Sequence, residues 1–271
     1  MIRRSSFRTR RSTEAMQDIA TPAQREAGTL GVALVTGGAK RVGAEIARSL
    51  HAAGAKVAVT YRSSATEAQA LCAELEQKRA GSALALQVSL GEAHALPALV
   101  DDVVRHFGRL DILVNNASTF YPTPLGRITA EAWTDLTDSN LKAPILLAQA
   151  AAAALRASRG VIINMVDIHA RRPLKDHIVY CAAKAGLVMA TLALTRELGP
   201  EVRVNGIAPG PIMWPERGMT DQLKQQIVDN TALKRAGSPR DIASLVLYLV
   251  REGTYLTGQI IAVDGGRSIG W

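Results

Sequence analysis

Short apolar runs alternate with longer amphipathic segments along most of this chain. The apolar runs predict buried β-strands over 32–36, 56–61, 83–88, 112–115, 161–165, 202–208 and 260–263. Between them, apolar residues recur at spacings of three and four, which predicts helices over 41–53, 64–79, 95–107, 130–136, 141–157, 180–198 and 239–250. The segment 209–239 contains several Pro and Gly residues and is expected to be a long loop.

Regular alternation of strands and helices is typical of a parallel sheet with right-handed crossovers. We therefore expect the α/β class, with a single Rossmann-like doubly wound parallel sheet of about seven strands and helices on both faces. The 271 residues show no change of composition that marks a second domain. We expect one domain over 29–271, including a substrate loop at 209–239, behind a disordered basic leader at 1–28.

Most of the net positive charge lies in the first eleven residues. The formal net charge is +8, and five arginines precede the first acidic residue, Glu14, so the rest of the chain carries +3. We therefore expect no nucleic-acid partner. The leader lacks the apolar segment of a secretory signal; a targeting peptide, a phosphate-binding arm and a functionless extension stay open.

The sequence does not indicate a membrane or a metal site. No run reaches the roughly 18 uninterrupted apolar residues of a membrane span. Cys72 and Cys181 form no spaced pair for a metal or a disulfide, and His169 and His177 are expected to be solvated loop residues. We expect a cytoplasmic protein that contacts no membrane and binds no metal.

A glycine-rich turn joins the first predicted strand to the first predicted helix. Glycines in this position let backbone N–H groups and the helix N-terminus approach a pyrophosphate closely. Arg41 stands where the usual dinucleotide fingerprint has its middle glycine. The turn predicts cofactor contacts at Gly37, Lys40, Arg41, Val42 and Gly43, although such a turn can also join a strand to a helix without a ligand.

The residues after the second predicted strand favour NADPH over NADH. An NAD site normally carries an acid about 20 residues beyond the first glycine, on the ribose 2′-hydroxyl. The segment 57–64 contains no acid, and it contains a cation that suits a 2′-phosphate. The predicted contacts here are Tyr61, Arg62, Ser63 and Ser64. A solvated charge at the strand end is the alternative for Arg62.

A tyrosine and a lysine four residues apart mark the expected chemical centre. Tyr180 and Lys184 share one face of a predicted helix, and an ammonium beside a phenol lowers the pKa of the phenol. We therefore expect Tyr180 to donate a proton near neutral pH. The pair follows the strand at 161–165, on the side where a cofactor bound at Gly37 would direct its nicotinamide.

Several short motifs extend from the glycine-rich turn to the C-terminus. They are Thr36-Gly37 with Gly43, Asn115-Asn116-Ala117, Asn140, Tyr180 with Lys184, Pro209-Gly210, Thr257-Gly258-Gln259 and Asp264-Gly265-Gly266. Over about residues 30–271 the chain resembles the short-chain dehydrogenase/reductase family. The resemblance implies that Tyr180 is the general acid, that Lys184 holds the nicotinamide ribose and tunes Tyr180, and that Asn140 joins a proton relay. It also implies cofactor contacts at Ser89, Leu90, Asn116, Ala117, Ser118, Tyr180, Lys184, Pro209 and Gly210. Ser89 stands where the family commonly has an Asp facing adenine.

Asp167 lies thirteen residues before Tyr180, where members of the family usually have Ser. A carboxylate there repels the oxyanion that develops when a ketone accepts hydride. It suits a C=N substrate better, because Asp can relay a proton to nitrogen or accept N–H groups from an aminopyrimidine ring. The alternatives are a weakened ketoreductase and an Asp in a surface salt bridge with Arg171 or Arg172.

With Asp167, the chain resembles the pteridine reductases within this family. Those enzymes share the T-G-x-x-x-R-x-G variant at 36–43 and the N-N-A-S-x-F segment at 115–120. The resemblance implies that Phe120 stacks on a pterin and that Ser118 and Arg41 contact cofactor phosphate or substrate. A core aromatic is the alternative for Phe120. Trp214 is expected either to line the substrate pocket or to cover the core.

The sequence therefore predicts NADPH-dependent reduction of a pterin, or of dihydrofolate, by Asp167, Tyr180, Lys184 and Asn140. One alternative is a ketoreductase for a 3-oxoacyl thioester. Another is a non-catalytic NADPH-binding regulator whose Arg-rich leader contacts an acidic partner or nucleic acid. Family members are commonly tetramers, and the Ala-rich helix at 141–157 is compatible with a homotetramer.

Overall fold

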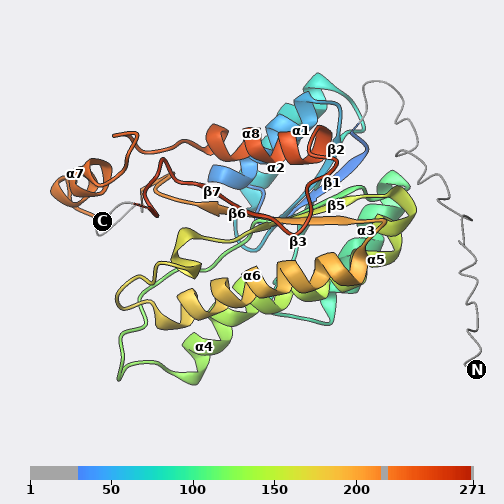
Figure 1. The fold of residues 1–271 in the computed structure, drawn as a ribbon. Coiled ribbons are helices and arrows are strands. Elements are labelled where there is room, and N and C mark those ends of the chain that lie inside the picture. The colour runs from blue at the N-terminus through green and yellow to red at the C-terminus, as the bar shows by residue number, and fades with distance from the viewer. Residues whose placement is uncertain (1–29, 215–218, 270–271) are drawn as a thin grey trace, which may run out of the picture.

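The computed structural model describes residues 30–214 and 219–269. Within them, seven strands form one parallel sheet in the order β3-β2-β1-β4-β5-β6-β7 (Figure 1). The strands are β1 (Val32–Val35), β2 (Lys56–Tyr61), β3 (Ala83–Gln87), β4 (Ile112–Asn115), β5 (Val161–Met165), β6 (Arg203–Pro209) and β7 (Ile260–Val263). Every residue of β1, β4 and β5 is buried, which explains why these strands are continuous apolar runs. The predicted leader lies outside the described residues.

Helices cover both faces of the sheet, as a doubly wound fold requires. They are α1 (Arg41–Ala52), α2 (Ala65–Lys78), α3 (Ala95–Phe107), α4 (Ala130–Thr137), α5 (Ala143–Ser158), α6 (Ile178–Leu198), α7 (Asp221–Asp229) and α8 (Pro239–Arg251). α1, α2 and α8 pack one apolar cluster against the first face, while α3 and α5 pack another against the opposite face, where α6 also lies (Figure 1). Both sheet faces are therefore buried, and the predicted fold class is confirmed.

Two predicted segments differ from the structure. α4 runs through a π-helical turn, Asp138–Lys142, into α5, where the sequence predicted two separate helices. The turn holds the buried Asn140, whose Nδ2 donates to the carbonyl oxygens of Leu136 at 2.9 Å and Thr119 at 2.8 Å. Such turns are frequent at functional sites because they redirect a side chain without breaking the helix.

The second difference is α7, which lies inside the segment predicted to be a loop. Thr220 caps it by accepting the Leu223 N–H. None of its residues is buried, and its apolar residues are only Leu223, Ile227 and Val228, a pattern too short to separate a helix from a loop in the sequence.

The crevice of this sheet lies at the carboxyl ends of β1 and β4. β1 sits between β2 and β4, so the connections turn in opposite directions on either side of it. Ligands of doubly wound sheets bind at such a switch point. The Thr36 hydroxyl, just after β1, accepts the Asn116 N–H at 2.9 Å and the Ala117 N–H at 3.0 Å, which ties the two strand ends together.

Among the described residues, α6 is the one helix long and apolar enough to cross a membrane by length and composition. A third of its most apolar window is buried in the fold. Lys184 interrupts its apolar sequence, and α6 packs on β6 and carries Tyr180 to the end of the sheet. We therefore treat α6 as part of the folded domain, and the absence of a membrane partner stays a prediction.

Candidate cofactor and catalytic site

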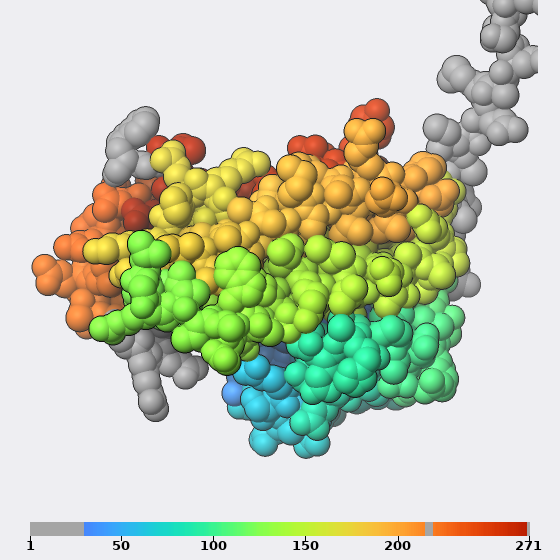
Figure 2. Space-filling model, turned by 90° about the horizontal axis from the view of Figure 1, so that it is seen from below, coloured from blue at the N-terminus to red at the C-terminus, as the bar shows by residue number. Residues whose placement is uncertain are grey.

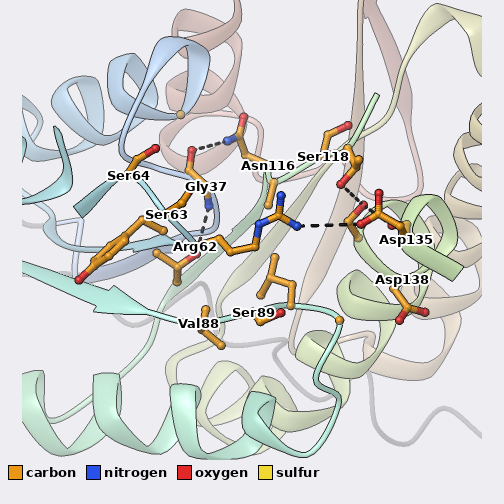
Figure 3. A pocket seen from close by; sticks show the side chains of 18 of the residues that line it. Gly37, Arg62, Ser63, Ser64, Val88, Ser89, Asn116, Ser118, Asp135 and Asp138 are labelled. Carbon is orange, nitrogen blue, oxygen red and sulfur yellow. Dashed lines mark hydrogen bonds and ion pairs between the residues drawn. The ribbon is translucent and has the colours of Figure 1, made fainter. Parts of the chain in front are cut away.

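A cavity of about 950 Å³ lies at the carboxyl ends of β1, β2 and β4 (Figure 3). Its volume is within the usual range for small-molecule and cofactor sites. It brings together most of the residues predicted to bind the cofactor: Gly37, Lys40, Arg41, Val42, Gly43, Tyr61, Arg62, Ser63, Ser64, Ser89, Leu90, Asn116, Ala117 and Ser118. The strand ends therefore gather these segments as the sequence predicted, while their contacts with a cofactor stay predictions.

The glycine-rich turn fits a dinucleotide pyrophosphate. A Cβ at Gly43 would lie 2.4 Å from the Gly37 carbonyl oxygen and 2.6 Å from Asn116 Nδ2, so only glycine allows this close packing. α1 has no side-chain cap, which leaves its first N–H groups available to an anion. Arg41 has φ +53°, the left-handed region that the glycine of the usual fingerprint would adopt without strain.

Two of the cations that line the cavity have acidic partners. Lys40 Nζ lies 2.6 Å from Glu67 Oε1, and Arg62 Nη1 lies 3.9 Å from Asp135 Oδ1. Arg62, predicted to contact a 2′-phosphate, and Lys40, predicted to contact the cofactor at the glycine-rich turn, each have a carboxylate beside them. The Arg62 side chain is 71% exposed and extends across the cavity toward α4 (Figure 3), so both its contact with a 2′-phosphate and the alternative of a solvated charge stay predictions.

Sequence reasoning missed the acidic wall of the cavity. Glu131, Asp135 and Asp138 line it from α4 and the π-helical turn. Their spacings of four and three place them on one side of the helix, which is the signal that could have found them. Asp138 lies beside the loop of Ser89 and Gly91, with its Oδ2 3.5 Å from a Cβ built on Gly91.

Asp167 and Tyr180 form the central contact of the predicted chemical site. The Tyr180 hydroxyl donates to Asp167 Oδ2 at 2.7 Å, and Asp167 Oδ1 accepts the His169 N–H at 2.8 Å. Asp167 therefore points at Tyr180, and the alternative of a surface salt bridge with Arg171 or Arg172 is wrong. Both carboxylate oxygens are occupied, which fixes the orientation of the group.

The predicted effect of Lys184 on Tyr180 is wrong in this structure. Burial raises the pKa of Tyr180 well above its ordinary value, and the Asp167 carboxylate raises it further, while a hydrogen bond with Ser118 acts in the opposite direction. Lys184 Nζ donates instead to the Met165 carbonyl oxygen at 2.8 Å, and burial lowers the pKa of Lys184 to about 8. Tyr180 therefore keeps its proton throughout the neutral range.

Ser118 and Phe120 connect the cavity to this centre. The Ser118 hydroxyl, on the cavity wall, donates to Asn140 Oδ1 at 2.7 Å. Phe120 is 47% exposed, so the core-aromatic alternative is wrong. Its ring meets Tyr180 edge-on at a centroid distance of 4.8 Å and stacks on His177 at 4.7 Å. Sequence reasoning took His177 for a solvated loop residue and missed this stack, which joins the loops after β4 and β5.

Some predicted residues lie outside the cavity lining. Ser118, on the cavity wall, bonds Asn140 and acts on Tyr180, and the Tyr180 side chain in turn contacts Asp167 and Phe120, with Lys184 Nζ 5.7 Å from its ring centroid. Pro209 and Gly210 lie at the end of β6, where Gly210 packs against Asp264, and their cofactor contacts stay predictions. Trp214 is half-buried, and its carbonyl oxygen is 3.5 Å from Arg41 Nη2. The described residues contain no cluster of three His, Cys, Asp or Glu that could hold a metal.

Several known proteins are similar to this chain in sequence or in fold. A family model described as enoyl-(acyl carrier protein) reductase matches residues 37–268. Pteridine reductase 1 of Leishmania tarentolae is 36% identical over 282 residues, which cover 89% of this chain and 97% of that protein. The 3-oxoacyl-[acyl-carrier-protein] reductase FabG of Staphylococcus aureus is also 36% identical, over 86% of this chain and 96% of that protein.

Among solved structures, a blue fluorescent protein from a metagenomic library, in complex with NADPH, superimposes with a TM-score of 0.83. It is 35% identical in sequence, and the match covers 88% of this chain and 98% of that one. The sequence matches span nearly all of the domain, and the fold match agrees with them. The chain belongs to the short-chain dehydrogenase/reductase family of oxidoreductases.

Proposed function

We propose that this protein is an NADPH-dependent pterin reductase, which adds hydride to a ring carbon of a C=N bond and a proton to the ring nitrogen. The observation that carries the proposal is the carboxylate of Asp167, held 2.7 Å from the Tyr180 hydroxyl. The substrate is a dihydropterin or a dihydrofolate, since both present the same aminopyrimidine head.

The cavity residues fit NADPH. The uncapped N-terminus of α1 suits the pyrophosphate, and Lys40, Arg62, Ser63 and Ser64 suit the 2′-phosphate. By the family resemblance, Lys184 would hold the nicotinamide ribose, and Asn116, whose Nδ2 donates to the carbonyl oxygens of Thr36 and Gly37, holds the glycine-rich turn in place. When bound, the cofactor supplies the hydride. The NADPH in the structurally similar blue fluorescent protein supports this choice of cofactor.

The charge on Asp167 favours a C=N acceptor over a ketone. A unit negative charge about 4 Å from a developing oxyanion raises its energy by about 4 kcal/mol at an effective dielectric constant of 20. A pterin avoids this repulsion, because its N–H groups donate to the carboxylate while the charge develops on a ring nitrogen. Tyr180 keeps its proton because its pKa is raised, so it can donate that proton to the nitrogen. After Tyr180 has donated its proton, a new proton reaches it through a relay that includes Asn140, whose side-chain oxygen accepts a hydrogen bond from the Ser118 hydroxyl.

Phe120 supplies the stacking surface for the flat substrate ring. It is half-exposed beside Tyr180, and His177 supports one of its faces. Offset stacking of a heteroaromatic ring on Phe is worth about 1 kcal/mol beyond the area it buries. Phe120 therefore orients the ring whose nitrogen receives the proton.

The second candidate is reduction of a 3-oxoacyl thioester. It is favoured by the 36% identity to the FabG reductase, which equals the identity to the pteridine reductase. Against it stands Asp167, because a thioester ketone develops an oxyanion beside the carboxylate.

The test is the rate of NADPH oxidation by the purified protein with dihydrobiopterin, with dihydrofolate and with a 3-oxoacyl thioester in parallel. The proposal expects turnover of a pterin at a kcat/KM well above that for the thioester. Turnover of the thioester alone would refute the proposal and indicate that the protein is a ketoreductase. Cofactor binding without turnover of any substrate would favour a non-catalytic regulator.

Assembly into a cytoplasmic homotetramer belongs to the same proposal. Ile178, Ala185, Met189 and Leu192 form an exposed stripe along one side of α6, and α6 lies beside α5 across the face in Figure 2. A second copy of the chain would cover this apolar stripe. Light scattering should give four times the chain mass, and Met189→Lys should yield a smaller species; a monomeric native protein would contradict the assembly.

A further inference from the structure

The cavity has a basic wall and an acidic wall that face each other. Lys40, Arg41 and Arg62 come from the β1 and β2 ends, while Glu131, Asp135 and Asp138 come from α4 and the turn that follows it. Arg62 crosses the space between them: its guanidinium lies in the cavity and is directed at Asp135, with Nη1 3.9 Å from Oδ1 (Figure 3). Arg62 suits the 2′-phosphate of the cofactor, whereas Asp135 faces it from the opposite wall and carries a charge that would repel that phosphate.

We propose that Asp135 is the counter-ion that Arg62 gives up when the 2′-phosphate of NADPH binds, so that Asp135 limits the preference of the protein for NADPH over NADH. The inference rests on the proposed cofactor. It adds a specificity-determining residue on the opposite wall of the cavity.

The geometry of the pair makes such an exchange feasible. The two side chains are 71% and 43% exposed and approach no closer than 3.9 Å, so water screens their attraction. A phosphate carries more charge than a carboxylate and can accept two parallel N–H bonds from a guanidinium. Arg62 therefore interacts more strongly with the 2′-phosphate than with the Asp135 carboxylate. NADH has a hydroxyl in place of that phosphate and leaves the Arg62–Asp135 pair intact.

The Lys40–Glu67 ion pair differs from the Arg62–Asp135 pair, because only Asp135 lies on the wall of the cavity opposite its cation. Glu67 lies 2.6 Å from Lys40, in the first turn of α2, and does not line the cavity. Asp135 stands on the far wall, so its attraction pulls Arg62 away from the β2 end. It also adds a negative charge that repels any phosphate entering the cavity.

Removing the charge of Asp135 should therefore tighten NADPH binding selectively. For Asp135→Asn we expect the Kd for NADPH to fall about two- to fivefold, the factor that an exposed ion pair is worth, with little change for NADH. In the Arg62→Ala background, which should itself weaken NADPH binding, Asp135→Asn should lose this effect.

Glu131→Gln is the matched control. Glu131 lies on the same helix and lines the same cavity, and its substitution removes the same charge without touching the Arg62 pair. A second control is needed because the Tyr121 phenol adjoins Asp135: burial raises the pKa of Tyr121 and the Asp135 carboxylate raises it further. Tyr121→Phe removes that contact and keeps Asp135.

The experiment is a titration of each variant with NADPH and with NADH, followed by isothermal calorimetry or by cofactor fluorescence. Selective tightening by Asp135→Asn that disappears without Arg62 supports the exchange. Weaker NADPH binding by Asp135→Asn, or equal tightening by Glu131→Gln, overturns it, since Asp135 would then orient Arg62 or act only through the general field. Because the readout is binding, a native protein that binds NADPH but reduces no pterin refutes the proposed reaction and leaves the exchange to be judged on its own result.

Discussion

Replacing Lys184 with Met should stabilise the protein while abolishing its activity. Lys184 is 2% exposed, and burial lowers its pKa from 10.5 to about 8. At about 1.4 kcal/mol per pH unit, this difference means that the charged form costs the folded state about 3 kcal/mol. Met fills similar space without a charge. It leaves the Met165 carbonyl without its hydrogen bond, which costs about 1–2 kcal/mol, so the net gain near neutral pH is about 1–2 kcal/mol.

The stability difference between Lys184→Met and the native protein should depend on pH. Below about pH 8, Lys184 is protonated in both the folded and the unfolded state, and the native protein carries the whole penalty. Between about 8 and 10.5 only the unfolded state binds the proton, so this group makes the native protein more stable as the pH rises. The advantage of Lys184→Met should therefore shrink over this range.

Urea unfolding followed by circular dichroism, near neutral pH and at about pH 10, measures both effects through the free energy of unfolding. Lys175→Met, at an exposed lysine, is the control and should change stability by less than about 0.5 kcal/mol. A Lys184→Met variant less stable than the native protein near neutral pH, or an advantage that does not depend on pH, would refute the reasoning.

Three further predictions concern the same site. For pterin reduction, kcat/KM should fall as the pH rises through about 8, because Lys184 then loses the charge with which it holds the nicotinamide ribose, while Tyr180 keeps its proton. A flat profile up to about pH 10 would contradict this role of Lys184. Gly43→Ala should weaken NADPH binding several-fold in a titration, because the added methyl, whose clash costs about 1–3 kcal/mol, must be accommodated by moving the turn away from the position that suits the pyrophosphate; unchanged affinity would argue against the close turn. Phe120→Ala should raise the KM for a pterin about five- to tenfold, with little change in melting temperature because the ring is half-exposed; an unchanged KM would remove Phe120 from the substrate site.

The sheet could be predicted closely because burial on both faces leaves a strong pattern. β2 (Lys56–Tyr61), β4 (Ile112–Asn115) and β5 (Val161–Met165) have the predicted bounds, since each is a short and mostly apolar run. The same pattern predicts that Gly37, Arg62 and Asn116 lie around one cavity, because the carboxyl ends of neighbouring parallel strands meet at one edge of the sheet.

What the sequence did not reveal depends on distances between elements. The opposition of Asp135 to Arg62 depends on how α4 packs beyond β4, and the stack of His177 on Phe120 depends on two loops that meet only in the fold. The pKa of Tyr180 depends on burial and on which charged group lies nearest. A spacing of four residues pointed to Lys184, whereas the carboxylate of Asp167 accepts the hydrogen bond from the hydroxyl.

The central claim is that Asp167 adapts this site to a C=N substrate. Its most direct test is Asp167→Ser, assayed by NADPH oxidation with dihydrobiopterin and with a 3-oxoacyl thioester beside the native protein. We predict that pterin turnover falls at least about a hundredfold, the usual contribution of a positioned acid or base, and that thioester turnover rises. Pterin turnover that survives in the variant, or thioester turnover that is already dominant in the native protein, would contradict the account.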